Sequence, residues 1–230
     1  MKRLFVIVML SFLLPSIYGQ ELTGKVVDSL YREDQFYIGA TYNLFEHQPS
    51  DVKQNSFSLG FHLGYIKDMP INKRRNKSIG IGIGYSTNSY IQNILINKDV
   101  SGDFTYAIID GATNFTKNKF SEHVLELPIE FRWRTSTISS YKFWRVYTGI
   151  KLGYVFSNRS KFRGDLGNLT FNNIEDYNKI QYGLTLSFGY NTWNIYAYYG
   201  LNPIFSKDAQ LNANRLELST IKLGLIFYVL

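Results

Sequence analysis

The chain has 230 residues and a formal net charge of +7, with 18 Tyr, 17 Phe and 18 Gly but only 5 Pro and no Cys. The absence of thiols excludes disulfides, thiolate metal sites and a lipid anchor on a processed Cys. The positive charges are scattered through the chain and form no single stripe, so we expect no nucleic-acid partner.

The first residues have the layout of a secretion signal. Lys2 and Arg3 precede an apolar run from Leu4 to Leu14, and Gly19 provides a small residue for cleavage. The run is too short for a transmembrane helix, which needs about 20 apolar residues. We therefore predict a cleaved signal peptide over residues 1–19, a periplasmic segment over 20–33 and one domain over 34–230.

Beyond Asp34 the sequence alternates with a period of two, which is typical of β-strands. One face of each predicted strand is apolar and often aromatic, and the other carries Gly, Ser, Thr or charged residues. The alternation predicts eight strands, over residues 36–44, 57–65, 78–86, 125–134, 144–156, 180–190, 193–201 and 221–229.

The connections between these strands alternate in length. Short ones cover residues 70–76, 135–141 and 191–192, and long ones cover 46–55, 93–121, 157–176 and 203–215. Outer-membrane barrels have short periplasmic turns and long outside loops. We expect an all-β protein, an eight-stranded antiparallel transmembrane β-barrel of the bacterial outer membrane, with both termini periplasmic. The long loop from Asn93 to Ser121 matches no known pattern.

The polar faces of the fourth and fifth predicted strands carry charges. On a lipid face each Arg or Lys near the midplane would cost about 2–4 kcal/mol, so these side chains should point into the barrel and pair. The predicted ion-pair residues are Glu126, Glu130, Arg132, Arg145 and Lys151. An interior filled by side chains leaves no diffusion pore and no substrate cavity.

Two groups of residues mark the ends of the strands. Aromatic residues beside the short turns are expected to form an interfacial girdle: Trp133, Trp144, Tyr190 and Trp193. The turn with Lys73, Arg74, Arg75 and Lys77 is densely basic, either as a solvated hairpin tip or as a docking site for an acidic periplasmic partner.

The sequence offers no motif for catalysis or cofactor binding. Gly80, Gly82 and Gly84 alternate with Ile, which is a strand pattern and no phosphate loop. We expect no catalytic residues, no metal and no cofactor. The three His residues leave an outer-membrane enzyme with a Ser and a His as a third hypothesis.

Five stretches together resemble one family. They are LYREDQFY at 30–37, DMPINK at 68–73, LPIEFRWRTST at 127–137, YNTWN at 190–194 and YAYYGLNPIF at 196–205. The chain resembles the PorT family of outer-membrane barrels from Bacteroidetes. That resemblance implies a non-enzymatic accessory role in type IX protein secretion, and in gliding where present, with protein partners in the secretion apparatus. It supplies no catalytic residues.

A second hypothesis is a generic small outer-membrane barrel that stabilises the envelope or binds ligands through its loops. The partners in the membrane would be lipid and other secretion components, and the sequence does not set the oligomeric state.

Overall fold

The computed structural model describes residues 33–54, 56–136 and 142–229. The predicted signal peptide, nearly all of the segment 20–33 and most of the turn 135–141 lie outside the described residues. No helix in the described ranges is long and apolar enough to cross a membrane.

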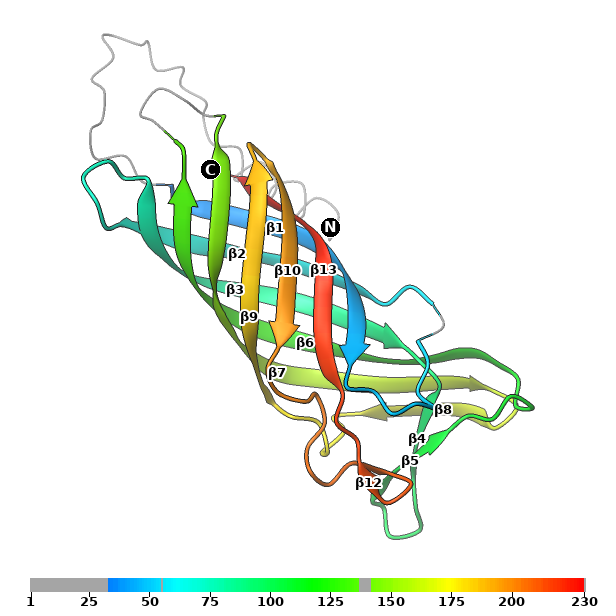
Figure 1. Ribbon diagram of the computed structural model, residues 1–230. Helices are drawn as coiled ribbons and strands as arrows, with labels where there is room; N and C mark the ends of the chain where they lie inside the picture. Colours follow the sequence, from blue (N-terminus) through cyan, green and yellow to red (C-terminus); the bar gives the residue numbers. More distant parts are fainter. Residues whose placement is uncertain (1–32, 55, 137–141, 230) are drawn as a thin grey trace, which may run out of the picture.

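Eight antiparallel strands form a closed barrel (Figure 1). Neighbouring strands pair in chain order, and the pairing of β1 with β13 closes the ring. This confirms the predicted eight-stranded antiparallel barrel. The strands are β1 (Gln35–Glu46), β2 (Leu59–Pro70), β3 (Lys77–Ile91), β6 (Phe115–Arg134), β7 (Trp144–Gly164), β9 (Ile180–Tyr190), β10 (Trp193–Gly200) and β13 (Ser219–Val229).

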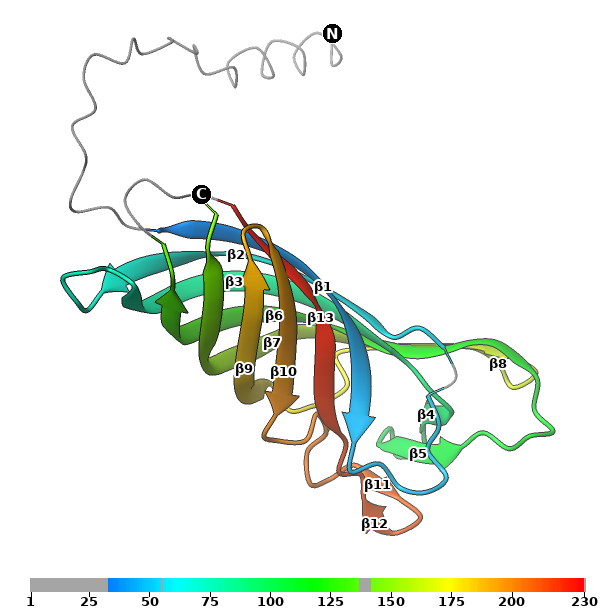
Figure 2. The same cartoon turned by 45° about the horizontal axis from the view of Figure 1, so that its top comes forward.

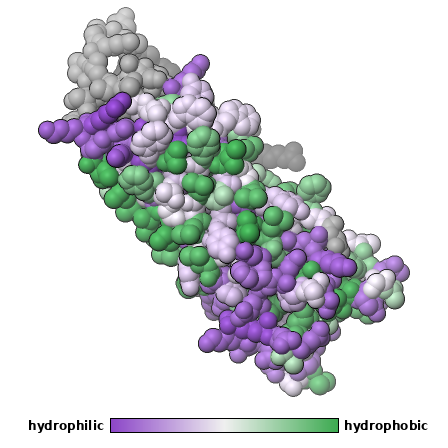
Figure 3. Space-filling view, viewed as in Figure 1, coloured by the Kyte–Doolittle hydropathy of each residue, from purple (hydrophilic) through white to green (hydrophobic). Residues whose placement is uncertain are grey.

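Burial follows the sequence alternation on every barrel strand. In β9 each second side chain is exposed and each intervening one is buried, from Ile180 to Tyr190. The exposed side chains are large and apolar, for example Leu184 at 48% and Phe188 at 47%. Other barrel strands expose similar side chains, and on the face seen in Figure 3 they form an apolar surface over the barrel. An aqueous solvent would not favour such a surface.

Small residues on the inner face make room for large ones. A Cβ on Gly80 would lie 2.9 Å from the Arg132 side chain, and one on Gly84 would overlap the Tyr37 hydroxyl. The alternating Gly and Ile of β3 are therefore a packing feature, as the strand interpretation of this stretch predicts.

At one end the chain builds further structure beyond the barrel (Figure 2). A second sheet contains β4 (Ile94–Lys98), β5 (Phe104–Ile108), β11 (Gln210–Leu211) and β12 (Asn214–Arg215). Strands β6 and β7 also extend past the barrel, where β7 pairs with β8 (Gly167–Asn172). The long connections predicted at 93–121, 157–176 and 203–215 thus contain strands.

The same end holds the main apolar core. The ring of Phe45 stacks on Tyr90 at 5.1 Å and on Phe120 at 5.6 Å between centroids. Ile94 and Leu211 from the second sheet join this cluster. Buried apolar side chains therefore close the barrel at its loop end.

Candidate functional site

The barrel interior near the short turns holds a charged cluster centred on Asp68 of β2. Arg134 Nη1 and Nη2 donate to the two Asp68 carboxylate oxygens, each at 2.9 Å. Arg132 Nη1 donates to Asp68 Oδ1 at 3.3 Å, and Arg132 Nε donates to Glu130 at 3.1 Å. Both guanidiniums are fully buried, so these pairs are shielded from solvent and salt.

A second cluster lies at mid-barrel around Glu126 of β6. Lys151 Nζ donates to Glu126 Oε2 at 2.8 Å, and His62 Nδ1 lies 3.2 Å from Glu126 Oε1. The Thr41 hydroxyl lies 3.1 Å from His62 Nε2. A hydroxyl, an imidazole and a carboxylate in this order are the parts of an activated nucleophile.

This arrangement has no room for a substrate. The cavity beside His62 and Glu126 measures about 10 Å³, which is at most enough for one water molecule. Thr41, His62 and Glu126 are all at most 3% exposed. The geometry supports a structural hydrogen-bond network that fills the barrel.

A third layer surrounds the buried carboxylate of Glu122 below the apolar core. Tyr177 donates its hydroxyl hydrogen at 2.6 Å, and Lys222 Nζ lies at 3.7 Å. Three further donors come from two strands, at 2.8–3.2 Å: Asn88 and Tyr90 of β3 and Gln181 of β9. Each of the three layers thus contains a buried carboxylate paired with at least one cation.

The structure places four of the five predicted interior charges in ion pairs: Glu126 with Lys151, and Glu130 with Arg132. Arg145 is the exception, because no ion pair of the described residues includes it. Its Nη1 donates instead to the backbone carbonyl of Asn191 at 2.6 Å, and its guanidinium lies 4.4 Å from the centroid of the Phe143 ring.

Sequence reasoning missed several members of the network. They are Glu33, Asp68, Glu122, Arg134 and Lys222. The signal for Asp68 was present, since the inward positions His62, Gly64 and Ile66 continue to it along β2. Glu122 lay between the predicted connection 93–121 and the predicted strand 125–134, and was assigned to neither.

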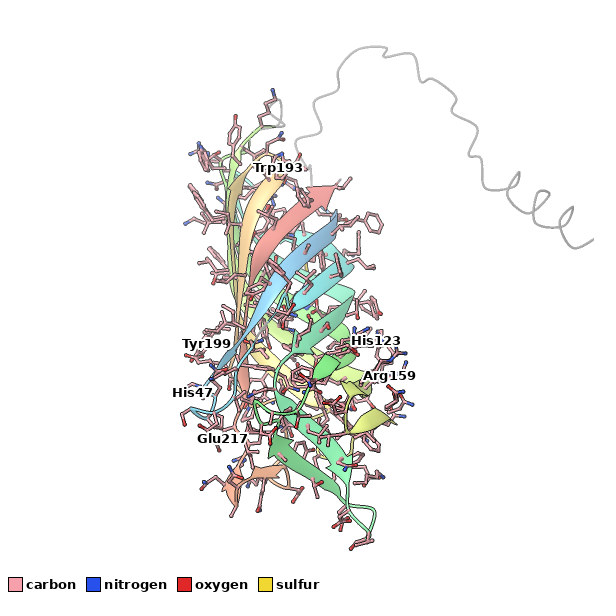
Figure 4. The ribbon with its side chains drawn as sticks, turned by 90° about the vertical axis from the view of Figure 1, so that its right-hand side faces the viewer. His47, His123, Arg159, Trp193, Tyr199 and Glu217 are labelled. Carbon is pink, nitrogen blue, oxygen red and sulfur yellow. The ribbon has the colours of Figure 1, made fainter. Side chains whose placement is uncertain are left out.

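The remaining predicted residues lie at the short-turn end. Trp133, Trp144, Tyr190 and Trp193 are all exposed on the outer face (Figure 4 labels Trp193). Trp144 lies 5.2 Å from Tyr190 between ring centroids. In the basic turn Lys73, Arg74 and Lys77 are exposed, whereas Arg75 is half-buried with a φ of 56°.

The histidines do not assemble a catalytic site with a serine. His123 lies on the outer face of β6, where its Nδ1 is 2.6 Å from the Tyr85 hydroxyl. Ser157 is its cross-strand partner on β7, but no serine within the described ranges hydrogen-bonds a histidine ring. Nor do those ranges contain three His, Asp or Glu side chains grouped to hold a metal.

The chain was compared with curated proteins and with solved structures. No curated protein matched the chain. Solved structures of Ail, the attachment invasion locus protein of Yersinia pestis, align over 87% of this chain and 100% of their own at 14% identity. One has sucrose octasulfate, a heparin analogue, bound. The TM-scores are 0.37 and 0.35.

Residues 19–206 match the profile described as outer membrane protein beta-barrel domain. This span covers seven of the eight barrel strands. The chain therefore belongs to the outer membrane protein beta-barrel domain family, and its place is the outer membrane.

Proposed function

We propose that this barrel is a non-enzymatic accessory component of type IX protein secretion that acts through contacts with other secretion components. The observation that carries the proposal is the filled interior. A barrel with a residual cavity of about 10 Å³ between Glu126 and Lys222 cannot conduct cargo, so its contribution must come from its surfaces.

The resemblance of five stretches to the PorT family directs the proposal toward type IX secretion. Two of them, around 127–137 and 196–205, include parts of β6 and β10. The first contributes Glu130 and Arg132 to the interior network. The second contains Tyr196 and Tyr198, which are buried against the mid-barrel charges.

We infer that the short turns and both chain ends face the periplasm. Strand β1 begins, and β13 ends, at the end that carries Trp144 and Trp193, since Phe36 pairs with Val229 and Trp193 with Phe227. The elaborated loops lie at the other end (Figure 1). Outer-membrane barrels carry their long loops outside.

In this orientation the basic turn between β2 and β3 points into the periplasm. Backbone and side-chain bonds fix its shape: Ile71 N–H donates to the Lys77 carbonyl at 3.0 Å, and Asn72 Nδ2 donates to Asn76 Oδ1 at 2.7 Å. A rigid tip with three exposed cations suits an acidic protein partner, because charge complementarity speeds and orients docking.

Charge reversal tests this role. The variant Lys73→Glu/Arg74→Glu/Lys77→Glu should secrete less type IX cargo while inserting a normal amount of barrel. The matched control, Lys53→Glu/Lys98→Glu/Lys207→Glu, reverses three exposed cations at the loop end and should secrete normally. Normal secretion by the turn variant would remove the basic turn from the mechanism.

The structured loop end favours a second candidate, a generic small barrel that binds a ligand through its loops. The sheet of β4, β5, β11 and β12 packs on the core through Ile96 and Tyr106, so it presents a fixed surface. Normal type IX secretion in a strain without this protein would leave this second candidate standing.

A further inference from the structure

The extension of β6 and β7 beyond the barrel carries a compact group of cations on its outer face. Lys119 pairs directly across the strands with Lys161, Lys117 pairs with Arg163, and Ser121 pairs with Arg159. Because cross-strand partners lie on the same face, all these side chains point the same way. We call the five cations the basic face: Lys117, Lys119, Arg159, Lys161 and Arg163.

The basic face has no internal compensation. None of its five members forms an ion pair with any residue that the structure describes. Asp165, at the nearby turn, instead accepts from the Asn114 backbone N–H at 3.0 Å. Arg163 and the other cations lower the pKa of Lys161. Like charges directly opposite each other destabilise a sheet, so an anionic ligand would relieve the repulsion.

The position of the basic face relates it to the membrane. It continues the lipid-facing side of β6, which runs outward from Leu125 through His123 to Lys119. Figure 4 shows His123 and Arg159 on the same side of the barrel, with Arg159 nearer the loop end. At roughly 3.3 Å per residue, Lys161 lies about 13 Å along β7 beyond Ser157. A headgroup layer of about 5–8 Å is within this reach.

A groove near the basic face lies where the lipid-facing part of β7 passes into its extension beyond the barrel. Strand β7 exchanges its partner from β9 to β8 between Tyr154 and Arg159, and a groove of about 410 Å³ opens there. Exposed Tyr154 and Phe156 line its apolar part, and Asn158, Asn173, Glu175 and Lys179 line its polar part. No residue of the basic face lines the groove itself, but Arg159 follows directly on Asn158 of its lining. Apolar side chains this close to a cation match an amphiphile better than a soluble polyanion.

We propose that the basic face binds the phosphate groups of an outer-leaflet glycolipid, one of whose acyl chains lies in the groove beside Phe156. On the neighbouring β8, Thr170 and Asn172 lie opposite Lys161 and Arg159 and supply neutral donors to the same headgroup. The proposal rests on the inferred orientation with the loops outside. It is independent of the role in type IX secretion.

Binding by the purified full barrel in zwitterionic detergent tests the proposal. Native mass spectrometry would count retained ligand for three probes: diphosphorylated lipid A, the same lipid without phosphates, and the deacylated bisphosphorylated disaccharide. The wild-type barrel should retain the first at least about tenfold more tightly than either of the others, since both the phosphates and the acyl chains contribute.

Two triple variants locate the site. Lys119→Gln/Arg159→Gln/Lys161→Gln should lose the preference for the phosphorylated lipid, while Lys53→Gln/Lys98→Gln/Lys207→Gln should keep it. Phe156→Ser should weaken both lipids alike. Resistance of each barrel to unfolding on unheated gels checks that it is folded.

Three results would overturn the proposal. Unchanged lipid retention in the first triple variant would show that the basic face is not part of the binding site. Unchanged retention in Phe156→Ser would show that the groove is not part of it. Equal binding of the deacylated disaccharide and the lipid would identify a surface for soluble anions. Failure in these binding assays leaves the secretion assays untouched, so the two proposals fail separately.

Discussion

The buried cluster around Asp68 gives the sharpest prediction about stability. The substitution Asp68→Asn keeps the size of the side chain but removes its charge. Asp68 accepts three N–H bonds from Arg132 and Arg134 and a further bond from the Ser78 hydroxyl at 2.6 Å. The amide retains one acceptor oxygen and places an NH₂ group against a guanidinium.

The expected loss follows from this geometry. A hydrogen bond to a charged group contributes about 1.5–3 kcal/mol, and breaking a buried ion pair costs about 3–5 kcal/mol because a charge is left unpaired. Glu130 still lies 3.1 Å from Arg132, and Glu33 lies 3.8 Å from Arg134. These carboxylates partly compensate the two positive charges and so reduce the loss of stability. We expect Asp68→Asn to lower the free energy of unfolding by about 3–5 kcal/mol.

Urea unfolding of the barrel refolded into phosphatidylcholine vesicles would measure this loss. The fluorescence of the three Trp residues reports the transition. Ser78→Ala should cost about 1 kcal/mol. Asp103→Asn, on an exposed loop, should change stability by less than about 0.5 kcal/mol. If Asp68→Asn were as stable as Asp103→Asn, the interior network would contribute nothing to folding.

Three further predictions concern the faces, the packing and the loops. Leu184→Arg should reduce the amount of inserted barrel far more than Ile71→Arg. Both positions are exposed, but only Leu184 faces the membrane interior, where an Arg costs about 2–4 kcal/mol. Equal yields of the two variants would contradict the assigned face. Gly84→Ala should destabilise the barrel because its methyl group meets the Tyr37 hydroxyl, whereas Gly111→Ala, in open space, should be neutral in the same urea assay. Hydrogen bonds from Thr113 lower the pKa of Asp110. Their stabilisation of the loop is therefore fully present above the ordinary carboxyl pKa and is lost as the pH falls through the lowered pKa. Thr113→Val should raise the pKa of Asp110 in an NMR titration.

The barrel strands were predictable because lipid on one side and a filled interior on the other enforce a period of two. The same signal weakens where β6 and β7 leave the membrane. There the outer face changes from Leu125 to Lys119 and Lys117, so neither face looks lipid-exposed and the stretch resembles a loop. The short strands β4 and β5 depend on packing against a core from distant segments, which no local pattern encodes.

The interior pairs were predictable in kind but not all in detail. Adjacent strands bring Glu126 to Lys151, and their alternation places both inside. Which residues meet depends on register, since Arg145 lies opposite Arg134 while Glu130 lies opposite Gly149. Arg145 therefore precedes Gly149, the position opposite Glu130, by four residues and does not reach Glu130 across the strands. Register between strands joined by a turn of unknown shape could not be derived from the sequence.

The proposal that this closed barrel serves type IX secretion through its surfaces is tested most directly in a strain that lacks the protein. The measurement is the fraction of a type IX cargo protein held in the periplasm, with uptake of a small dye as the control for envelope integrity. We predict that cargo accumulates in the periplasm, that dye uptake stays near the wild-type level, and that the wild-type gene restores export. Normal export of the cargo in the deletion strain would contradict the claim.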